Sequence, residues 1–494
     1  MRFLSSIKFV SYLRVALLTT VNIVLNAVTL GRYIWLEGRV RNGIFMNWAR
    51  RFCYMPEKFV QPSTETEIVE LVKNSRNLRV FGSGHSFNTG VVSDETLVSL
   101  DNYSGLVHRE GLKEDQLAVK GGTRVRDVVK LLFDRGLAFE ALPSHDAQSI
   151  AGILSTDVHG TGRDWGFVSE SVVRLRLVDG NGNIHECQPS DDLFKAAIGG
   201  IGAVGIITEV VVQGVRRFNV KQKVEMRDIS FDKENDKNDF DQLLRDGLIK
   251  NDHFSIYLFP FTKKCQINTW NCREKDQTIL GRLQEFIEIT KGHVLEFVNI
   301  SIDALAAAWV GNFLAYTGRL PQLGRTYGFI RPGSDLLLES NKGFNRTIYH
   351  LHQELEFTVP YEDTFEACKR FIELYEDLYE QMYPSGLPYT LFEVRFTPEH
   401  DNTLIGAGRG RHSTWIDLVC TDSCGFERYY GAAQRVVREI GARPHLGKYC
   451  EIFTKADMAT LHGDNFTTFL NLIEKHDPDG RFANGFTRRL LGHG

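Results

Sequence analysis

Three short glycine-rich stretches lie in the first half of the 494-residue chain and constrain its fold more than any other feature. The first is Gly82-Ser-Gly-His-Ser86, which follows Leu78, Val80 and Phe81, apolar residues typical of a short strand. The second spans residues 149–162 and the third residues 198–208. Glycine allows positive φ angles and a close approach of the backbone to a ligand. Three such loops in one contiguous region predict one long ligand laid across several loops.

The first loop combines a glycine pair with a histidine and two serines. A turn that aligns several free backbone N–H groups can hold phosphate oxygens. Glycine-rich turns after strands are common, however, and the residues alone also permit an ordinary β-turn that exposes His85. The two later loops favour the ligand-binding interpretation.

The order and wording of the three loops resemble the vanillyl-alcohol-oxidase superfamily of flavoproteins, specifically its aldonolactone oxidase and alditol oxidase branch. In that branch, the histidine of Gly-x-Gly-His-Ser carries FAD through a covalent bond to the isoalloxazine 8α carbon. The resemblance therefore implies that His85 is the FAD attachment site. The cofactor-binding residues that we expect on this basis are Gly82, Ser83, Gly84, His85, Ser86, Ser149, Gly152, Ser155, His159, Gly160, Gly162, Gly202, Gly205 and Ile206.

Residues in and beside the second loop have further expected roles. His145 and Asp146 precede the loop and are placed to orient it. By resemblance, the region around Ala151 and Gly152 controls the access of dioxygen to the flavin, and small residues there are compatible with an oxidase. His159 is expected to support the packing of FAD, with a role as catalytic base as the alternative.

Composition and charge argue against several other classes of protein. The chain is 43% hydrophobic and 24% charged, which is ordinary for a globular protein. Its net charge of −4, without a basic stripe or recognition motif, argues against a nucleic-acid partner. The eight cysteines are scattered without zinc-ligand spacing, so we expect reduced thiols and no metal site.

The pattern of elements predicts an α+β fold in several parts. In residues 48–216, short apolar strands alternate with loops and amphipathic helices, as in the two-subdomain FAD-binding domain of the vanillyl-alcohol-oxidase type. Residues 217–425 are more aromatic and contain longer helical segments, and the resemblance places an α/β cap (substrate) domain there. Residues 426–494 are expected to return to the FAD domain, and residues 1–47 form an N-terminal hydrophobic segment.

Three local patterns make sharper structural predictions. Thr64 followed by Glu67 is typical of a helix N-cap with a capping box. Residues 179–183 read Asp-Gly-Asn-Gly-Asn between two apolar runs and predict a β-hairpin. Residues 363–382 carry apolar side chains at spacings of three and four, which predicts an amphipathic helix packed on a core.

The N-terminal segment contains a run of 17 uncharged residues, 15–31, bounded by Arg14 and Arg32. About 17 residues is the lower limit for a membrane-spanning helix, and asparagines and threonines make this run only modestly apolar. Three interpretations stay open: a membrane anchor or interfacial helix, a helix packed on the protein, and a targeting segment. We expect membrane association through this segment and an otherwise cytoplasmic protein.

Residues 392–396, Phe-Glu-Val-Arg-Phe, alternate as a strand does, so Glu393 and Arg395 point to one face. A carboxylate that accepts hydroxyl protons beside a guanidinium that donates can hold a polyol. On spacing alone, a solvent-facing ion pair is the simpler interpretation. The resemblance reverses this preference, because alditol oxidases carry a Glu-x-Arg pair in the active site.

Residues 443–448, Arg-Pro-His-Leu-Gly-Lys, form a second candidate constellation. The proline and the glycine stiffen and sharpen a loop, and His445 and Lys448 are candidate proton and charge partners. An ordinary basic surface loop is the alternative. The stretch resembles the family's Pro-His-Trp-Gly-Lys motif, in which the lysine lies at the flavin and helps to bind substrate. Leu446 replaces the tryptophan here, which leaves the shape of the pocket open.

Together these features predict an FAD-dependent oxidase of a sugar alcohol or sugar lactone. The substrate hydroxyl is expected to lie between Lys448, Arg395 and Glu393 and to pass its proton to a base, for which His445 is the candidate. Hydride passes to flavin N5, and dioxygen takes the electrons and gives hydrogen peroxide. The alternatives are a dehydrogenase that uses a quinone or cytochrome, an oxidase of a lipid-linked sugar, and a flavin-binding protein without turnover.

Overall fold

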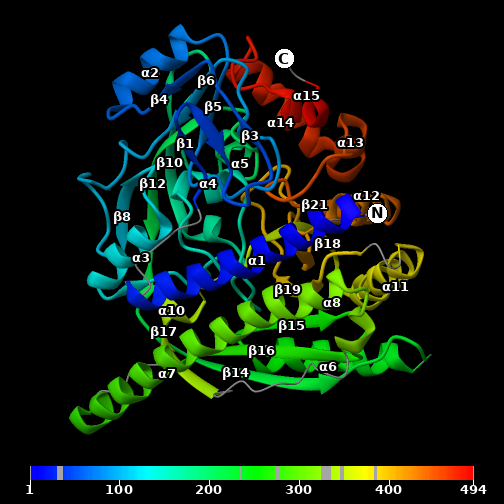
Figure 1. The fold of residues 1–494 in the computed structure, drawn as a ribbon. Helices are drawn as coiled ribbons and strands as arrows, with labels where there is room; N and C mark the ends of the chain where they lie inside the picture. Colours follow the sequence, from blue (N-terminus) through cyan, green and yellow to red (C-terminus); the bar gives the residue numbers. More distant parts are fainter. Residues whose placement is uncertain are drawn as a thin grey trace.

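The computed structural model describes residues 2–29, 37–233, 235–273, 278–323, 335–344, 350–382, 386–423 and 425–492, with side chains from residue 9 onwards. Its upper half contains the N-terminal sheets and the C-terminal helices, and its lower half contains one large sheet with its helices (Figure 1). The three glycine-rich stretches belong to the upper half, and the Glu-x-Arg stretch belongs to the large sheet.

The first part of the upper half is a small parallel sheet in the order β4-β6-β5, with α2 beside it. The helix begins where predicted, because Oγ1 of Thr64 accepts the N–H of Glu67 and the Glu67 carboxylate accepts the N–H of Ser63. A short antiparallel sheet precedes it in the chain. The elements are β1 (Arg39–Arg41), β2 (Ile44–Met46), β3 (Cys53–Tyr54), β4 (Lys58–Val60), α2 (Glu65–Asn74), β5 (Leu78–Phe81) and β6 (Thr96–Ser99).

The second part is an antiparallel sheet in the order β11-β10-β12-β8-β7. The hairpin predicted at residues 179–183 is confirmed, because β10 and β11 pair antiparallel on either side of it. The elements are β7 (Leu106–Val107), β8 (Gln116–Lys120), α3 (Val125–Asp134), β9 (Leu137–Ala138), α4 (Ile150–Ser155), η1 (Val168–Ser171), β10 (Val172–Val178), β11 (Ile184–Cys187), α5 (Asp192–Ala197), β12 (Ile206–Gln213) and β13 (Val215–Arg216).

The lower half contains, within the described residues, an eight-stranded sheet in the order β17-β14-β16-β15-β19-β20-β18-β21. The predicted amphipathic helix is α11, which buries Phe365, Cys368, Tyr375 and Tyr379. The strands are β14 (Asn219–Asp228), β15 (His253–Phe259), β16 (Lys264–Arg273), β17 (Asp335–Glu339), β18 (His352–Pro360), β19 (Thr390–Thr397), β20 (Ser413–Thr421) and β21 (Arg443–Pro444). The helices are α6 (Asp236–Lys250), α7 (Ile279–Leu305), η2 (Ala306–Gly311), α8 (Asn312–Tyr316), η3 (Leu320–Gln322), α10 (Ser340–Gly343), η4 (Tyr361–Asp363), α11 (Thr364–Met382) and α12 (Phe426–Glu439).

The large sheet continues past the domain boundary predicted at residue 425. Strand β21, at Arg443–Pro444, pairs with β18 and is the last strand of the large sheet. Helix α12 lies between the predicted boundary and β21, and it contacts α11 and β18. The change in composition marks the end of β20 rather than the end of the sheet, because the returning edge strand has only two residues and no pattern of its own.

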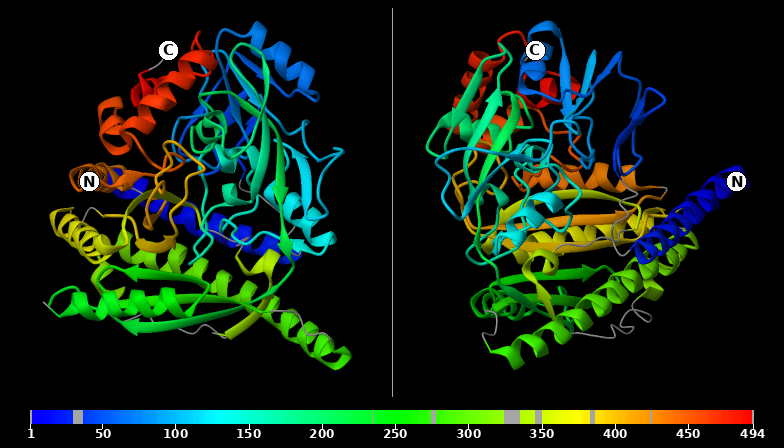
Figure 2. Two further views of the ribbon diagram at one scale, coloured as in Figure 1. Left: turned by 180° about the vertical axis from the view of Figure 1, so that it is seen from behind. Right: turned by 90° about the vertical axis from the view of Figure 1, so that its left-hand side faces the viewer.

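The last part of the chain contacts the first parallel sheet. The N–H of Leu78 donates to the carbonyl of Arg481 (2.8 Å), and Nδ2 of Asn77 donates to the carbonyl of Ala483 (2.6 Å). The C-terminal helices lie beside the N-terminal sheets in both views of Figure 2. They are α13 (Lys455–His462), α14 (Asp464–His476) and α15 (Gly485–Leu491).

The N-terminal segment forms a long helix, α1 (Arg2–Val28), that packs on the lower half. It lies beside α7 and α8 in Figures 1 and 2. Nε1 of Trp309 donates to Oγ1 of Thr20 (3.0 Å), the ring of Tyr12 stacks on Tyr316, and Arg14 pairs with Asp422. By length and composition, residues Phe9–Val28 and Ile279–Tyr316 could each cross a membrane.

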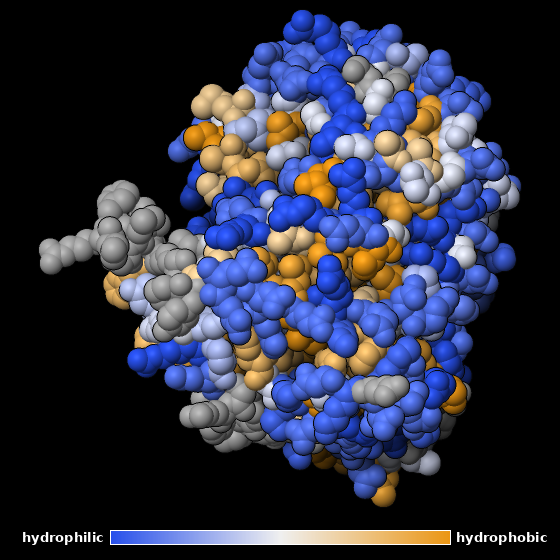
Figure 3. Space-filling view, turned by 90° about the vertical axis from the view of Figure 1, so that its right-hand side faces the viewer, coloured by the Kyte–Doolittle hydropathy of each residue, from blue (hydrophilic) through white to orange (hydrophobic). Residues whose placement is uncertain are grey.

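Hydrophilic residues cover most of the face seen in Figure 3, and hydrophobic residues gather in a band across its middle. The band lies at the level where the upper and lower halves of the molecule meet. The main core extends through both halves, since buried side chains of β8, β12, β18 and β20 belong to one cluster. The two halves are therefore packed on each other along an apolar junction.

Candidate active site

A long cleft of about 1630 Å³, counted out to its open mouth, lies between the two halves. Its upper wall is made by all three glycine-rich stretches, and its lower wall by β18, β19, β20 and the loop after β21. The expected cofactor residues that line it are Gly82, Ser83, Gly84, His85, Ser86, Ser149, Gly152, Ser155, His159, Gly202, Gly205 and Ile206. The four residues expected to act on substrate, Glu393, Arg395, His445 and Lys448, line the same cleft.

Gly160 and Gly162 were expected to bind the cofactor, but they lie outside the residues that line the cleft. The N–H of Gly160 donates to the carbonyl of Gly166, and the N–H of Gly162 donates to the carbonyl of Phe396. A Cβ at Gly162 would lie 2.1 Å from the carbonyl oxygen of Trp165. These glycines therefore permit close packing of two backbone segments, which a sequence pattern cannot distinguish from ligand contact.

The first loop is shaped by close approaches that only glycine allows. A Cβ at Gly82 would lie 2.1 Å from Oγ of Ser149, and a Cβ at Gly84 would lie 2.7 Å from Cα of Gly38. Gly84 also has a φ of +64°, a conformation that side-chain-bearing residues rarely adopt. The first and second loops are consequently pressed together at the base of the cleft.

The first loop also offers hydrogen-bond donors to a ligand. Within the described residues, the backbone N–H groups of Ser83, Gly84 and Ser86 donate to no protein acceptor. Buried backbone N–H groups rarely stay unpaired, and Ser83 and Gly84 are buried. Successive N–H groups around a left-handed residue form a nest for anionic oxygens. The loop therefore fits the pyrophosphate of FAD.

Arg79, which is not among the site residues predicted from the sequence, joins three segments of the upper wall by hydrogen bonds. Its guanidinium donates to the carbonyls of Gly90, Phe482 and Ile201 at 2.7 Å each. These carbonyls belong to the segment just after the first loop, to the C-terminal segment and to the third loop. Burial lowers the pKa of Arg79 to about 10, which still leaves the side chain charged at neutral pH. Its position inside a strand does not indicate a role in the site, because arginines in strands usually face solvent.

His85 lies in the cleft between two other rings. Its ring stacks on that of Trp48, with centroids 5.0 Å apart, and meets the ring of His145 edge-on at 4.2 Å. Nε1 of Trp48 donates to the carbonyl of His85 (3.1 Å). The half-buried imidazole is thus held in a fixed orientation, and the alternative of an exposed histidine on an ordinary turn does not describe it.

The residues that directly follow the first loop bind the loop that contains Lys448. Nδ2 of Asn88 donates to the carbonyls of Leu446 (2.7 Å) and Lys448 (2.9 Å). The N–H of Phe87 donates to the carbonyl of Gly447 (3.0 Å). Two motifs more than 350 residues apart in sequence are therefore joined directly by hydrogen bonds.

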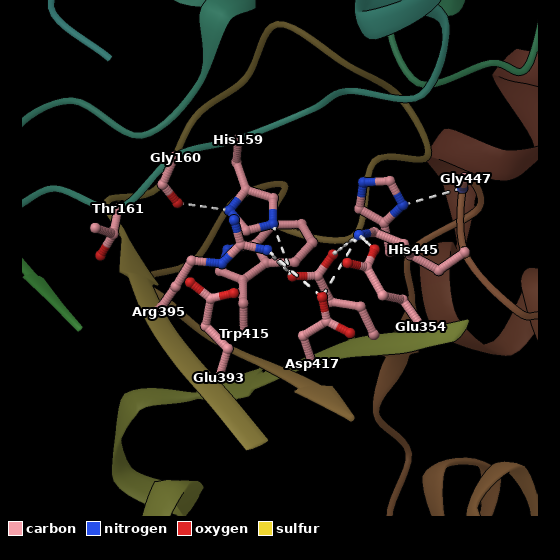
Figure 4. A network of polar contacts seen from close by, with 12 residues as sticks. His159, Gly160, Thr161, Glu354, Glu393, Arg395, Trp415, Asp417, His445 and Gly447 are labelled. Carbon is pink, nitrogen blue, oxygen red and sulfur yellow. Dashed lines mark hydrogen bonds and ion pairs between the residues drawn. The ribbon is translucent and has the colours of Figure 1, made fainter. Parts of the chain in front are cut away.

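Four residues form one row across neighbouring strands of the large sheet. Tyr257 pairs with Glu393, Glu393 pairs with Asp417, and Asp417 pairs with Glu356. Because side chains that stand directly opposite share a face, three carboxyl groups point into the cleft side by side. Tyr257 donates to Oε1 of Glu393 (3.2 Å). Figure 4 shows Glu393 and Asp417 converging with Arg395.

Two cations offset this concentration of negative charge. Nζ of Lys448 pairs with Glu354 and lies 3.5 Å from Oδ2 of Asp417 and 3.8 Å from Oε2 of Glu356. The guanidinium of Arg395 pairs with Glu356. Like charges directly opposite one another destabilise a sheet, and buried charges persist only when they are paired. Each cation is therefore required by the carboxyl groups around it.

The environment separates the pKa values of these carboxyl groups. Burial is the main cause that raises the pKa of Asp417 well above its ordinary value, and the neighbouring carboxylates add to the rise against Lys448. Burial acts in the same direction on Glu356, but Arg395, His159 and Lys448 outweigh it and hold the pKa of Glu356 well below its ordinary value. Asp417 therefore holds a proton more readily than Glu356 does.

His445 is placed to donate rather than to accept a proton. The N–H of Gly447 donates to Nδ1 of His445 (3.0 Å), so the neutral ring carries its proton on Nε2. Burial lowers the pKa of His445 to about 3, which keeps the ring neutral. Neither ring nitrogen then offers a free lone pair, and the geometry argues against His445 as the base that the sequence analysis expects.

His159 extends from the second glycine-rich loop to the charged groups of the large sheet. Nε2 lies 3.2 Å from Oε1 of Glu356 and Nδ1 lies 2.8 Å from the carbonyl of Gly160, while the ring stacks on Trp415 at 3.6 Å. Figure 4 shows the ring of His159 directed at the charged cluster from the side opposite Glu393. This position matches the supporting role expected for His159 better than the alternative of a catalytic base.

Glu354, Glu356 and Asp417 are not among the site residues predicted from the sequence. Glu354 and Glu356 lie two residues apart in one strand, which is the same signal that identified Glu393 and Arg395. Asp417 stands alone among apolar residues in β20, where an isolated buried carboxyl group indicates a partner from elsewhere. Both signals are present in the sequence, but only the strand order shows that these carboxyl groups lie close together.

Comparisons with known proteins agree with this geometry. A profile of the D-arabinono-1,4-lactone oxidase family matches residues 218–490, and a profile of an FAD-binding domain matches residues 56–188. The molecule is thus an FAD-dependent oxidoreductase of the vanillyl-alcohol-oxidase type that acts on CH–OH groups. More particularly, the chain belongs to the D-arabinono-1,4-lactone oxidase family.

Several curated proteins are similar to the chain. L-gulono-1,4-lactone dehydrogenase of Mycobacterium tuberculosis is 27% identical over 91% of this chain and 99% of its own. L-gulonolactone oxidase of Mus musculus is 25% identical over 90% and 98%. D-arabinono-1,4-lactone oxidase of Candida glabrata is 34% identical over 46% and 44%.

A solved structure, cholesterol oxidase from B. sterolicum, matches with a TM-score of 0.69 at 16% identity, over 91% of this chain and 96% of that chain. This likeness shows that the α+β fold, with an FAD-binding part and a substrate part, is the one expected.

Proposed function

We propose that this protein oxidises a sugar-1,4-lactone at a CH–OH group, with dioxygen as the electron acceptor and hydrogen peroxide as the product. The observation that carries the proposal is that Glu393, Arg395 and Lys448 line the same cleft as the three glycine-rich loops. FAD, when bound along those loops, supplies the acceptor for the substrate hydride. The family match and the lactone-oxidising relatives support a lactone over an alditol as the substrate.

Arg395 and Lys448 orient the substrate. Both are cations fixed by buried carboxylates, so their donors are held in place before the substrate arrives. Preorganised donors of this kind cost no reorganisation during the reaction. The lactone ring and its hydroxyl groups are polar and flat, which suits a guanidinium and an ammonium group on one wall.

Glu393 accepts the hydroxyl proton. It is the carboxylate of the row that forms no ion pair within the described residues, and its Oε1 accepts a hydrogen bond from the hydroxyl group of Tyr257. A general base must lie within hydrogen-bond reach of the proton that it removes, and Glu393 is part of the cleft wall beside Arg395. The N–H on Nε2 of His445 is then available to donate to a carbonyl oxygen in the cleft.

His85 carries FAD covalently in this proposal. The imidazole lies in the cleft at the first loop, and its orientation is fixed by Trp48 and His145. A linkage at this position would keep the cofactor on the protein through every turnover.

We also propose that the protein associates with a membrane surface through α1 and α7. Exposed apolar side chains follow one face of each helix, and contiguous apolar surface of this kind marks an interaction site. They are Val10, Leu17, Val21, Val24 and Val28 in α1, and Ile279, Leu280, Leu283, Phe286, Ile287 and Val294 in α7. Because the contacts of Tyr12, Arg14 and Thr20 tie α1 to the lower half, an in-plane position suits it better than a spanning one.

Oxygen uptake and peroxide formation test the proposed reaction. Purified protein loaded with FAD is mixed in air with D-arabinono-1,4-lactone, L-gulono-1,4-lactone, and the corresponding polyols as controls. The proposal expects uptake of one O₂ and release of one H₂O₂ for each lactone oxidised, with slower turnover of polyols. Turnover with an artificial quinone acceptor but no oxygen uptake would instead assign the dehydrogenase alternative.

A further inference from the structure

Two histidines and one aspartate meet where the β10–β11 hairpin packs against the end of α14. Nε2 of His185 lies 2.8 Å from Oδ2 of Asp179, and Nδ1 of His476 lies 3.3 Å from the same oxygen. The three atoms all lie within 4.8 Å of one another. Two imidazole nitrogens and one carboxylate oxygen are preferred ligands of Zn²⁺. We propose that Asp179, His185 and His476 bind one zinc ion.

The carboxylate is held in the orientation that a metal ligand needs. Oδ1 of Asp179 accepts the N–H groups of Asn181 (3.0 Å) and Asn183 (2.8 Å), which leaves Oδ2 directed at the two histidines. Groups that orient a ligand in this way are a regular part of metal sites. The hairpin sequence that produces the turn therefore also positions the ligand oxygen.

The two sides of the site are fixed against each other. The N–H of Gly180 donates to the carbonyl of His476 (2.7 Å), and a Cβ at Gly180 would lie 2.3 Å from Oδ1 of Asp477. In both views of Figure 2, the tip of the hairpin lies beside the C-terminal helices. Since the backbone is already in place on both sides, a metal ion needs only small side-chain adjustments.

The spacing of the ligand atoms is close to that of a zinc site. Tetrahedral bonds of about 2.0–2.1 Å place ligand atoms about 3.3 Å apart, which matches the distance from His476 to Asp179. The 2.8 Å distance from His185 must open by about half an ångström. His185 is partly exposed, so its ring can move and the fourth position can hold water.

The three groups are of the types that bind a divalent cation. Metal binding uses the imidazole tautomers that leave Nε2 of His185 and Nδ1 of His476 unprotonated. One anionic and two neutral ligands are an ordinary zinc set.

The site lies away from the cleft, since none of its three residues lines it. Zinc would join the FAD-binding half to the C-terminal segment, whose following residues bond to Arg79 and Asn77. An ion that binds only the folded chain stabilises it by mass action. The inferred role is therefore structural, and it is independent of the proposed reaction.

Zinc titration of the full-length, FAD-loaded protein tests the inference. Protein dialysed against a chelator is titrated with ZnCl₂ by calorimetry, and bound zinc is counted by mass spectrometry. We expect one zinc ion per chain, a higher melting temperature with zinc, and an X-ray absorption shell of nitrogen and oxygen at about 2.0–2.1 Å. An absorption spectrum without histidine ligands would overturn the proposal.

Two variants and one control assign the ion to these residues. His185→Ala and His476→Gln are expected to weaken zinc binding by at least about 100-fold, since loss of an outer-shell partner alone costs roughly 10–100-fold. His108→Ala removes an exposed histidine from the same half of the molecule and should leave binding unchanged. If His476→Gln fails to fold, the partly exposed His185→Ala decides. Equal zinc affinity in wild type and His185→Ala would overturn the proposal. The bound zinc would then be an adventitious ion only, and the three residues would form a simple hydrogen-bonded cluster.

Discussion

Nζ of Lys448 lies 3.5 Å from Oδ2 of Asp417, the middle carboxyl group of the row that crosses the large sheet. This contact joins the loop that the first glycine-rich stretch holds to the floor of the cleft. The cofactor wall and the substrate wall are thereby linked through one ammonium group. The charge of Lys448 is consequently important for both the packing of the site and its chemistry.

Lys448→Met removes that ammonium group but keeps most of the volume of the side chain. We expect kcat/KM for the lactone to fall by about 10²–10³, the usual effect of removing one preorganised donor. The folded state should also lose about 3 kcal/mol or more, because the fully buried carboxylate of Glu356 and the partly buried Glu354 lose their ammonium partner. Steady-state kinetics and urea unfolding measure the two effects. Lys448→Arg, which keeps the charge, is the control, and an unchanged kcat/KM in the methionine variant would exclude the proposed role.

His85→Ala tests the covalent linkage. Acid-precipitated wild-type protein should form a yellow pellet, while the variant should release its FAD into the supernatant or lose it during purification. His108→Ala, at an exposed position, is expected to behave like wild type. Absorbance of pellet and supernatant gives the answer. A colourless pellet from fully loaded wild-type protein would disprove the linkage without disproving FAD binding.

Buried neutral histidines predict a loss of stability in mild acid. Burial, followed by the charges of nearby arginines, lowers the pKa of His462 to about 3. Between that value and the unfolded value of about 6.5, the unfolded chain binds more protons. Stability from this group is therefore complete above about pH 6.5 and falls as the pH decreases towards 3.

His462→Gln removes this dependence at a position outside the cleft. In urea unfolding at a series of pH values, the slope of stability against pH below about 6.5 should be shallower than in wild type. The largest difference for one proton is about 1.4 kcal/mol per pH unit. The exposed His108→Gln should keep the wild-type slope. Identical slopes in His462→Gln and wild type would show that His462 titrates normally in the fold.

Membrane association depends on the apolar faces of α1 and α7. Leu17→Glu combined with Val24→Glu places two charges on the exposed face of α1 and should abolish co-flotation with liposomes. Asn102→Glu combined with Thr460→Glu adds the same charges to exposed positions of the upper half and should have no effect. If wild-type protein stays at the bottom of the gradient with every lipid composition, the proposal fails.

Much of the upper half could be predicted from sequence, because its signals are local. The cap at Thr64 and the hairpin at residues 179–183 depend on neighbouring residues and formed as predicted. The loop glycines were recognised by their spacing, but Gly160 and Gly162 serve backbone packing instead of the cleft. A glycine in the sequence indicates a positive φ or a close contact, but it does not show whether the contacting atoms belong to the protein backbone or to a ligand.

Only part of the candidate site could be predicted from the sequence, because the rest depends on the order of the strands in the large sheet. Glu393 and Arg395 were found from a period of two within one strand, but Asp417 lies opposite Glu393 only because β20 pairs with β19. The same limit applies to Asp179 and His476, which come together from distant parts of the chain. Non-local pairing of this kind has no sequence signal short of the fold itself.

The most direct test of the central claim is anaerobic reduction of the bound flavin by a lactone. Wild-type protein mixed with D-arabinono-1,4-lactone or L-gulono-1,4-lactone should lose its yellow absorbance. Glu393→Gln, which keeps the shape and the bond to Tyr257, should lose it at least about 100-fold more slowly, as expected for removal of a general base. Wild-type protein that dithionite bleaches but neither lactone does would contradict the account.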